Sequence, residues 1–235
     1  MEAAGVTVKG KNHSVNQDSF LLKETEDITI LAVSDGLGSL EFSDKGSSIL
    51  CEVLCQLIDE KEIYVEDMAA MAKLVHERWI NLLNAREIDI SKSYATCLIC
   101  ILKENTAYIF RLGDGIICMR ADQEIKVFFD KKEDRFYNET VCLSELFDAD
   151  EWEFFQWEYD DLEGIVLCSD GVDIFCDGMS QEEAVTLFAD DFFNAYGSQP
   201  VETSQKEILG WLSEWKSSDD KTLVYLVKGV CCKDD

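Results

Sequence analysis

Short apolar runs rich in β-branched and aromatic residues recur along the chain, and each predicts a β-strand. The predicted strands are 29–34, 94–102, 107–112, 116–120, 125–129, 154–159, 165–169 and 222–227. Gly113-Asp114-Gly115 separates two of these runs, so the sequence predicts a hairpin that turns at these three residues.

Four further segments have apolar residues three and four positions apart, which is the pattern of an amphipathic helix. The first two predicted helices cover about 43–59 and 66–84. Two more begin at the capping-box spacings Ser180–Glu183 and Ser204–Glu207 and run to about 195 and 215. The predicted elements follow the order strands, two helices, a strand meander, two helices and a last strand. This order predicts an α+β fold in which helices cover an antiparallel sheet or sandwich.

Several aspartates stand where a predicted strand meets a turn: Asp18, Asp35, Asp114, Asp170, Asp219 and Asp220. If the strands form one sandwich, several of these ends meet at one rim. Carboxylates gathered there would repel and desolvate one another, and a cation relieves that cost. Oxygen ligands suit Mg²⁺ or Mn²⁺ rather than zinc, and the carbonyl of Gly36 is a further candidate ligand. Each Asp-Gly alone is better explained as a turn, but the ordered set favours a metal site.

In this order, the segments NQDS, AVSDGLGSLEFSDKGS, SYATCLIC, RLGDGIICMR, IVLCSDGV and SSDDKTLVYLV resemble the type 2C family of metal-dependent serine/threonine phosphatases. The resemblance covers essentially the whole chain and is greatest to compact bacterial members. It implies a central antiparallel β-sandwich flanked by helix pairs, in α-β-β-α layers, with a binuclear Mn²⁺ or Mg²⁺ site at one end.

The same resemblance implies roles for individual residues. Asp35 would bridge two ions, and the Gly36 carbonyl would bind one of them. Asp170 and Asp219 would bind the other ion, while Asp18 would hold a water molecule on the metal. Two further residues match family positions. Asp114 matches an aspartate that is associated with a third, weaker ion, and Thr96 matches a position on a strand near the site.

The chain departs from the family pattern at three positions. His13 stands where many members have an arginine that grips the substrate phosphate, and a histidine lacks that planar fork. His13 could instead hydrogen-bond the phosphate or donate a proton, or have only a structural role. Leu37 follows the first Asp-Gly, where some relatives have a histidine. Ile174 replaces a common third-metal aspartate, with Asp173 one position early, so two ions are expected and a third is left open.

Composition narrows the function classes. The 235 residues are 47% apolar and include one proline, which predicts one folded domain over 1–235. A net charge of −27 argues against nucleic-acid and anionic-membrane binding. A metal site needs few of the 48 acidic residues, so most are expected on a solvated surface.

The sequence shows neither a signal peptide nor a membrane span, which predicts a cytoplasmic protein. Cys97 and Cys100 lie within a strand-like run, where they would face opposite ways, so structural thiols are favoured over a zinc or redox pair.

The segment 130–161 is acidic and rich in aromatic residues, and the resemblance implies a variable flap at this place. Phe155, Trp157 and Tyr159 alternate with polar residues there, so an amphipathic strand is favoured over a partner-docking surface. The expected function is hydrolysis of phosphoserine and phosphothreonine in proteins by water that two metal ions activate. The expected partners are phosphoproteins and a cognate Ser/Thr kinase, and the expected state is a monomer. The alternative is a catalytically weak or inactive module that docks phosphoproteins.

Overall fold

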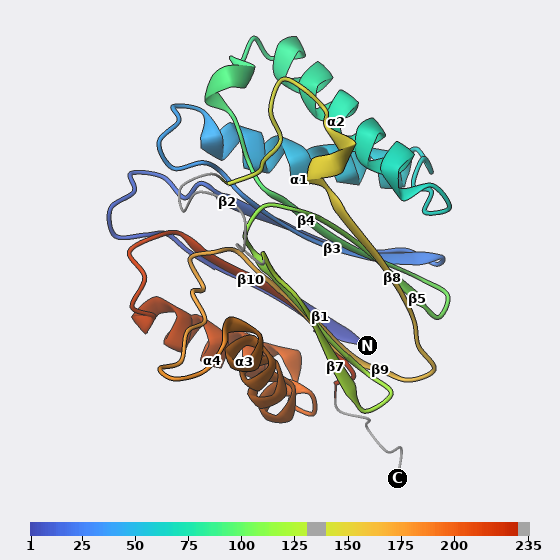
Figure 1. Cartoon of the computed structure of the whole chain (residues 1–235), viewed down its shortest axis with the longest axis vertical. Coiled ribbons are helices and arrows are strands. Elements are labelled where there is room, and N and C mark those ends of the chain that lie inside the picture. The colour runs from blue at the N-terminus through green and yellow to red at the C-terminus, as the bar shows by residue number, and fades with distance from the viewer. Residues whose placement is uncertain (131–139, 230–235) are drawn as a thin grey trace.

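Two five-stranded antiparallel sheets lie face to face in the computed structural model, which describes residues 1–130 and 140–229 (Figure 1). One sheet has the order β1 (Glu2–Val8), β10 (Lys221–Val227), β9 (Leu162–Cys168), β6 (Ile116–Ala121), β7 (Glu124–Phe128). The other has the order β2 (Asp18–Glu24), β3 (Ile28–Asp35), β4 (Cys97–Lys103), β5 (Thr106–Leu112), β8 (Glu153–Glu158). The central strands are apolar on both faces because each sheet is covered on both sides.

Helices form the two outer layers of the molecule, as Figure 1 shows. Helices α1 (Ser43–Asp59) and α2 (Met68–Ala85) pack on the β2–β8 sheet, and α3 (Gln181–Tyr196) and α4 (Val201–Glu214) pack on the β1–β7 sheet. Two 3₁₀ turns, η1 (Ile90–Lys92) and η2 (Ala149–Glu151), lie in the connections. The predicted α+β sandwich with flanking helix pairs is therefore confirmed.

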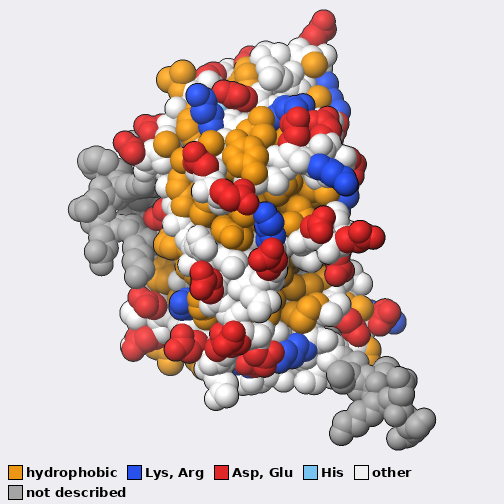
Figure 2. All heavy atoms as spheres, turned by 90° about the vertical axis from the view of Figure 1, so that its right-hand side faces the viewer, with side chains coloured by type: hydrophobic (Ala, Val, Ile, Leu, Met, Phe, Trp, Pro, Cys, Tyr) orange, Lys and Arg blue, Asp and Glu red, His pale blue; other side chains and the backbone are white. Residues whose placement is uncertain are grey.

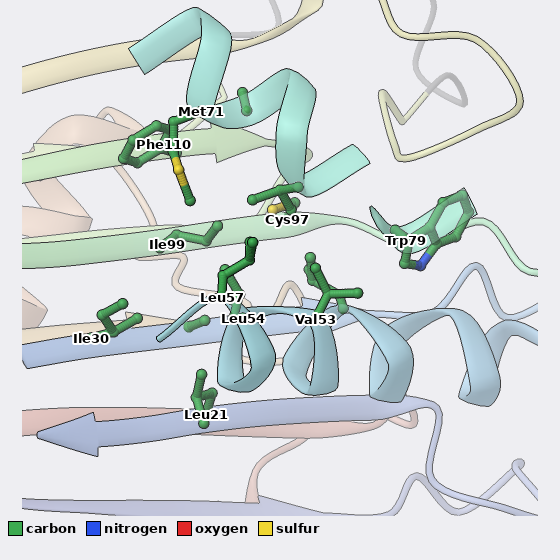
Figure 3. Close-up of a cluster of buried hydrophobic side chains, with 14 of the residues drawn as sticks. Leu21, Ile30, Val53, Leu54, Leu57, Met71, Trp79, Cys97, Ile99 and Phe110 are labelled. Carbon is green, nitrogen blue, oxygen red and sulfur yellow. The ribbon is translucent and has the colours of Figure 1, made fainter. Parts of the chain in front are cut away.

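Three apolar clusters hold these layers together. The cluster of Figure 3 joins α1 and α2 to the sheet beneath them, with Leu54 and Trp79 fully buried against strand residues such as Ile30. The Trp79 indole N–H donates to the carbonyl of Gly46 at 2.9 Å, so its polar atom is satisfied inside the core. A second cluster lies between the two sheets, and a third lies under α3 and α4.

Cys97 and Cys100 lie on opposite faces of β4, as predicted. Cys97 belongs to the cluster under α1 and α2, while Cys100 belongs to the cluster between the sheets. Burial raises the pKa of Cys97 well above its usual range and that of Cys100 to about 12. Both thiols therefore act as small buried hydrophobic groups.

The predicted hairpin at Gly113–Gly115 is wrong. Strand β5 pairs with β4 and β8, whereas β6 pairs with β7 and β9 in the other sheet. The chain crosses between the sheets at this point, and Gly113 adopts φ +118° there. Turn residues predict a change of direction, but they do not show whether the next strand stays in the same sheet.

The fourth helix does not begin at Ser204. It begins at Val201 with Pro200 as its N-cap residue, and the Ser204 hydroxyl is buried against the Tyr225 hydroxyl at 2.6 Å. The other predicted capping box is confirmed, since Ser180 and Glu183 satisfy each other's backbone amides. Pro200 was the better start signal, because its fixed φ suits a helix start.

Strands β1 and β2 are absent from the predicted set. The first contains two alanines and a glycine, which have low strand propensity, and it forms through its pairing with β10. Gly5 is needed in it because a Cβ there would lie 2.1 Å from the Phe20 ring.

Residues 131–139 of the predicted flap lie outside the described residues. The rest of the segment packs on the body of the protein: Trp152 and Phe147 contact the α1–α2 cluster, and β8 forms an edge strand. Trp157 is buried, and Phe155 and Tyr159 pack against the cluster between the sheets. The amphipathic strand is therefore confirmed, and its aromatic face points inward. Within the described residues, the helices include none that is long and apolar enough to span a membrane.

Candidate metal and active site

The strand ends that carry the predicted acids meet at one rim of the sandwich. Strands β3, β5 and β9 end there, and β2, β6 and β10 begin there, because neighbouring strands are antiparallel. The register places Asp18 directly opposite Asp35, and it places Cys168 opposite both Ile116 and Leu223. The loops that follow or precede these ends lie together at the left of Figure 1.

Asp35 stands between two other carboxylates at this rim. Burial, followed by the negative charges of Asp18 and Asp170, raises the pKa of the Asp35 carboxyl well above its usual range. Three acidic side chains from three different strand ends therefore meet at one point. The structure thus brings together three of the predicted site residues, Asp18, Asp35 and Asp170.

One carboxylate oxygen of Asp18 is held by a buried hydroxyl. The Ser169 hydroxyl donates to its Oδ2 at 2.7 Å, and the Thr222 amide donates to the Ser169 oxygen at 2.9 Å. Its other oxygen, Oδ1, is buried and has no hydrogen-bond partner. Burial raises the pKa of Asp18 to about 6, although the hydrogen bond from Ser169 opposes this rise.

Backbone contacts fix Asp35 and Gly36 in place. The Asp35 amide donates to the Thr96 hydroxyl at 2.9 Å, and the Gly36 amide donates to the Gln17 carbonyl at 3.1 Å. A Cβ on Gly36 would lie 2.4 Å from the carbonyl oxygen of Ser43 at the start of α1. Glycine is required because the helix start packs directly on this turn. Thr96, expected near the site, therefore supports the Asp35 backbone.

A cleft of about 300 Å³ opens beside this cluster. Asp114, Asp170 and Asp219 all line it, so these predicted site residues share one space. Asp114 accepts a hydrogen bond from the Thr140 hydroxyl at 3.0 Å. Asp173 lines the same cleft, although it lies one position before the family's third-metal aspartate.

His13 joins the rim through Asp219 and Asp220. Its Nδ1 lies 2.8 Å from Asp220 Oδ2, and its Nε2 lies 3.6 Å from Asp219 Oδ1. Asp220 is fully buried and also accepts hydrogen bonds from the amides of Gly10 and Gln17, at 2.6 and 2.7 Å. Asp220 therefore anchors the loop between β1 and β2 to the start of β10.

Sequence reasoning gave no role to Asp220 or Ser169. Two adjacent aspartates before a strand do not show which one points inward, and the structure turns Asp220 in and leaves the Asp219 side chain about half exposed. Ser169 belongs to one Ser-Asp-Gly, and Ser34 precedes Asp35 in the other. Both serines are buried and hydrogen-bonded, and this repetition was the signal that could have identified them.

The donor set fits a hard divalent cation. The buried, unpartnered Asp18 Oδ1 and the mutually repelling carboxylates around Asp35 form an arrangement that a cation would stabilise. Carboxylate and carbonyl oxygens are the ligands that Mg²⁺ and Mn²⁺ prefer.

Acidity is not confined to the rim. Figure 2 shows the opposite end of the sandwich, where Asp and Glu side chains are spread among neutral, apolar and basic ones. Many acidic residues therefore lie on an ordinary solvated surface. What distinguishes the rim is the burial of its carboxylates.

Comparison with known proteins agrees with this architecture. The sequence pattern described as Protein phosphatase 2C matches residues 8–213. A Mycoplasma genitalium protein named as a candidate protein phosphatase is 21% identical over 256 residues, which cover 91% of this chain and 96% of that protein.

Solved structures with the same fold include a bacterial serine phosphatase, with a TM-score of 0.68, 15% identity and 97% of each chain covered. The serine/threonine phosphatase Stp1 from Staphylococcus aureus also has a TM-score of 0.68, with 15% identity over 96% of this chain and 94% of that one. The catalytic domain of the serine/threonine protein phosphatase PstP, solved with two manganese ions, has a TM-score of 0.65 and 18% identity over 95% of this chain and 96% of that one. Because the family match spans most of the sequence, this chain belongs to the protein phosphatase 2C family of protein serine/threonine phosphatases.

Proposed function

We propose that this protein hydrolyses phosphoserine and phosphothreonine in proteins, using two divalent cations, Mn²⁺ or Mg²⁺, held at the rim. The observation that carries the proposal is the position of Asp35 between Asp18 and Asp170, with an orphaned buried oxygen on Asp18. When bound, such ions lower the pKa of water and neutralise phosphoryl oxygens, which permits direct attack on phosphorus. A Ser/Thr kinase that produces these phosphoproteins is the partner that the reaction requires.

Each side chain has a proposed task. Asp35 would bridge both ions, because its carboxylate lies beside those of Asp18 and Asp170. Asp170 and Asp219, which line the cleft, would hold one ion, and the Gly36 carbonyl would hold the other. Asp114 lines the same cleft and remains the candidate for a third ion.

Asp18 would orient water rather than contact an ion. The Ser169 hydroxyl fixes one of its oxygens, which leaves Oδ1 to accept a proton-bearing partner. Because Ser169 is itself held by the Thr222 amide, the carboxylate orientation is set by the β9–β10 pairing. Supports of this kind keep a reacting group in position at no cost during turnover.

His13 can serve a phosphoester only through Nε2. Its Nδ1 already lies against Asp220, so contact with a phosphate oxygen and proton donation to the leaving group would both use the same ring atom. The guanidinium fork of many relatives is absent, so the cations at the rim must neutralise more of the phosphate charge than they would beside an arginine.

A phosphatase assay tests the proposal. Tag-free protein is incubated with a phosphothreonine peptide in Mn²⁺, in Mg²⁺ or in EDTA, and phosphate release is measured. We expect turnover only with metal, and we expect Asp35→Asn to lower it by at least about a hundredfold, since a bridging ligand supports both ions. Asp27→Asn is the matched control, because Asp27 is exposed at the opposite end of the same strand.

Two results would contradict the proposal. One is phosphopeptide binding without turnover in the wild-type protein, which would favour the regulatory module. The other is full activity in a folded Asp35→Asn variant.

A further inference from the structure

His13 lies between a buried carboxylate and an accessible one. Asp220 lies behind the ring with only 1% of its side chain exposed, whereas Asp219, on the other side, is 48% exposed. Donor atoms of all three residues lie within 4.8 Å of one another. This arrangement is therefore closed on the Asp220 side and open on the Asp219 side.

The hydrogen bonds of Asp220 fix the tautomer of the ring. A carboxylate can only accept, and Asp220 Oδ2 lies 2.8 Å from Nδ1, so Nδ1 carries a proton. In the neutral imidazole the lone pair is then on Nε2, the atom that faces Asp219. The amides of Gly10 and Gln17 bond the same carboxylate and keep it from rotating away.

The gap between His13 and Asp219 suits a shared cation. Nε2 and Asp219 Oδ1 are 3.6 Å apart, which is longer than an ordinary hydrogen bond. Adjacent nitrogen and oxygen ligands about 2.1 Å from one octahedral ion lie about 3.0 Å apart, so a small side-chain movement at the half-exposed Asp219 brings the pair to that spacing. Histidines that bind metals typically donate their other ring N–H to a carboxylate, which is what His13 does with Asp220.

A second observation points to a ligand at this place. Two buried oxygens on the neighbouring residues, Gln17 Oε1 and Asp18 Oδ1, have no hydrogen-bond partner. Gln17 Oε1 and His13 Nε2 lie 3.3 and 3.6 Å from the position that a Cβ on Gly38 would take, so the unpartnered Gln17 oxygen lies close to the imidazole. Water on a cation bound by Nε2 would give that oxygen a hydrogen-bond donor.

We propose that His13 Nε2, together with Asp219, binds one of the divalent cations at the rim, with Asp220 as the residue that orients the ring. This inference rests on the proposed function, because it concerns the same cations. It changes the donor set from oxygen alone to oxygen plus one imidazole nitrogen. Imidazole suits transition-metal ions better than Mg²⁺, so the site should favour Mn²⁺ over Mg²⁺.

The chain offers a clean spectroscopic test because it contains only two histidines. The other, His76, is buried in α2, bonds the Ser144 carbonyl and contacts the rings of Trp79 and Phe147. Tag-free protein labelled with ¹⁵N-histidine is loaded with Mn²⁺ and studied by pulsed electron paramagnetic resonance. We expect a nitrogen coupling that changes with the label.

Matched variants assign that coupling. It should disappear in His13→Asn, whose side-chain amide can still donate to Asp220, and it should persist in His76→Asn. By calorimetry, His13→Asn should weaken Mn²⁺ binding by at least about tenfold and Mg²⁺ binding by much less.

The outcomes separate this inference from the proposed function. Bound Mn²⁺ with turnover but without histidine coupling would overturn the His13 assignment alone, and would return Nε2 to phosphate contact or proton donation. Failure to bind Mn²⁺ at all would overturn both. A coupling that survives in His13→Asn would also overturn the assignment.

Discussion

Replacing Asp18 by asparagine should stabilise the metal-free protein while weakening its hold on metal. Burial raises the pKa of Asp18 from 3.8 to about 6, so ionising this group in the folded chain costs free energy. One pKa unit corresponds to about 1.4 kcal/mol, which gives an upper limit of roughly 3 kcal/mol at pH 7.5. The asparagine carbonyl can still accept the hydrogen bond from Ser169 and carries no charge.

The dependence on pH has a definite sign. Because the pKa of Asp18 is raised in the folded state, the unfolded chain releases its proton first as pH rises. Folding stability therefore falls between about pH 4 and pH 6, and the cost is fully present above that range. The variant should gain stability at pH 7.5 and almost none at pH 4.

Urea unfolding in EDTA at these two pH values measures the effect, with Asp27→Asn as the control for lost surface charge. Saturating Mn²⁺ should then raise the stability of the wild type by more than that of the variant, because a ligand stabilises the state it binds. A variant no more stable than the wild type at pH 7.5, or equally stabilised at both pH values, would refute the reasoning.

Three further substitutions test how the rim is built. Gly171→Ala should lower the free energy of unfolding by more than about 2 kcal/mol in urea, because a Cβ there would lie 1.8 Å from the Asp220 carbonyl oxygen; a neutral effect would show that this contact yields. Thr96→Val should lower the free energy of unfolding by about 1–3 kcal/mol and weaken Mn²⁺ binding in calorimetry, because it leaves the Asp35 amide without its acceptor. Unchanged Mn²⁺ binding would show that Thr96 does not support the site. Ser180→Ala should lower stability by about 1 kcal/mol through loss of the α3 cap without changing metal affinity, so a change in affinity would contradict the separation of cap and site.

Local patterns in the sequence predicted most elements because each depends on its own residues. The spacing of apolar residues in α1 predicted its limits as the structure has them, and the alternation in β8 predicted an amphipathic strand. The structure adds that this strand lies at the edge of its sheet and packs its alternating aromatic residues inward. Two failures came from tertiary context. The chain changes sheets at Gly113–Gly115, and β1 is a strand because β10 pairs with it.

The candidate site was predictable as a set of strand-end acids, but not in its supporting contacts. Asp35 and Asp170 follow visibly apolar strands, and their convergence follows from the face-to-face packing of the two sheets to which these strands belong. The inward turn of Asp220 and the orientation of His13 depend on the loop between β1 and β2, which spans two different sheets. The sequence contains no periodic signal for a contact of that kind.

Anomalous diffraction at the manganese edge, from crystals soaked in Mn²⁺, tests the central claim most directly. We predict peaks at the rim within about 2.2 Å of carboxylate oxygens, with Asp35 touching two ions and Asp170 and Asp219 touching one of them. Crystals with full solvent access and no anomalous peak beside Asp35 would contradict the account.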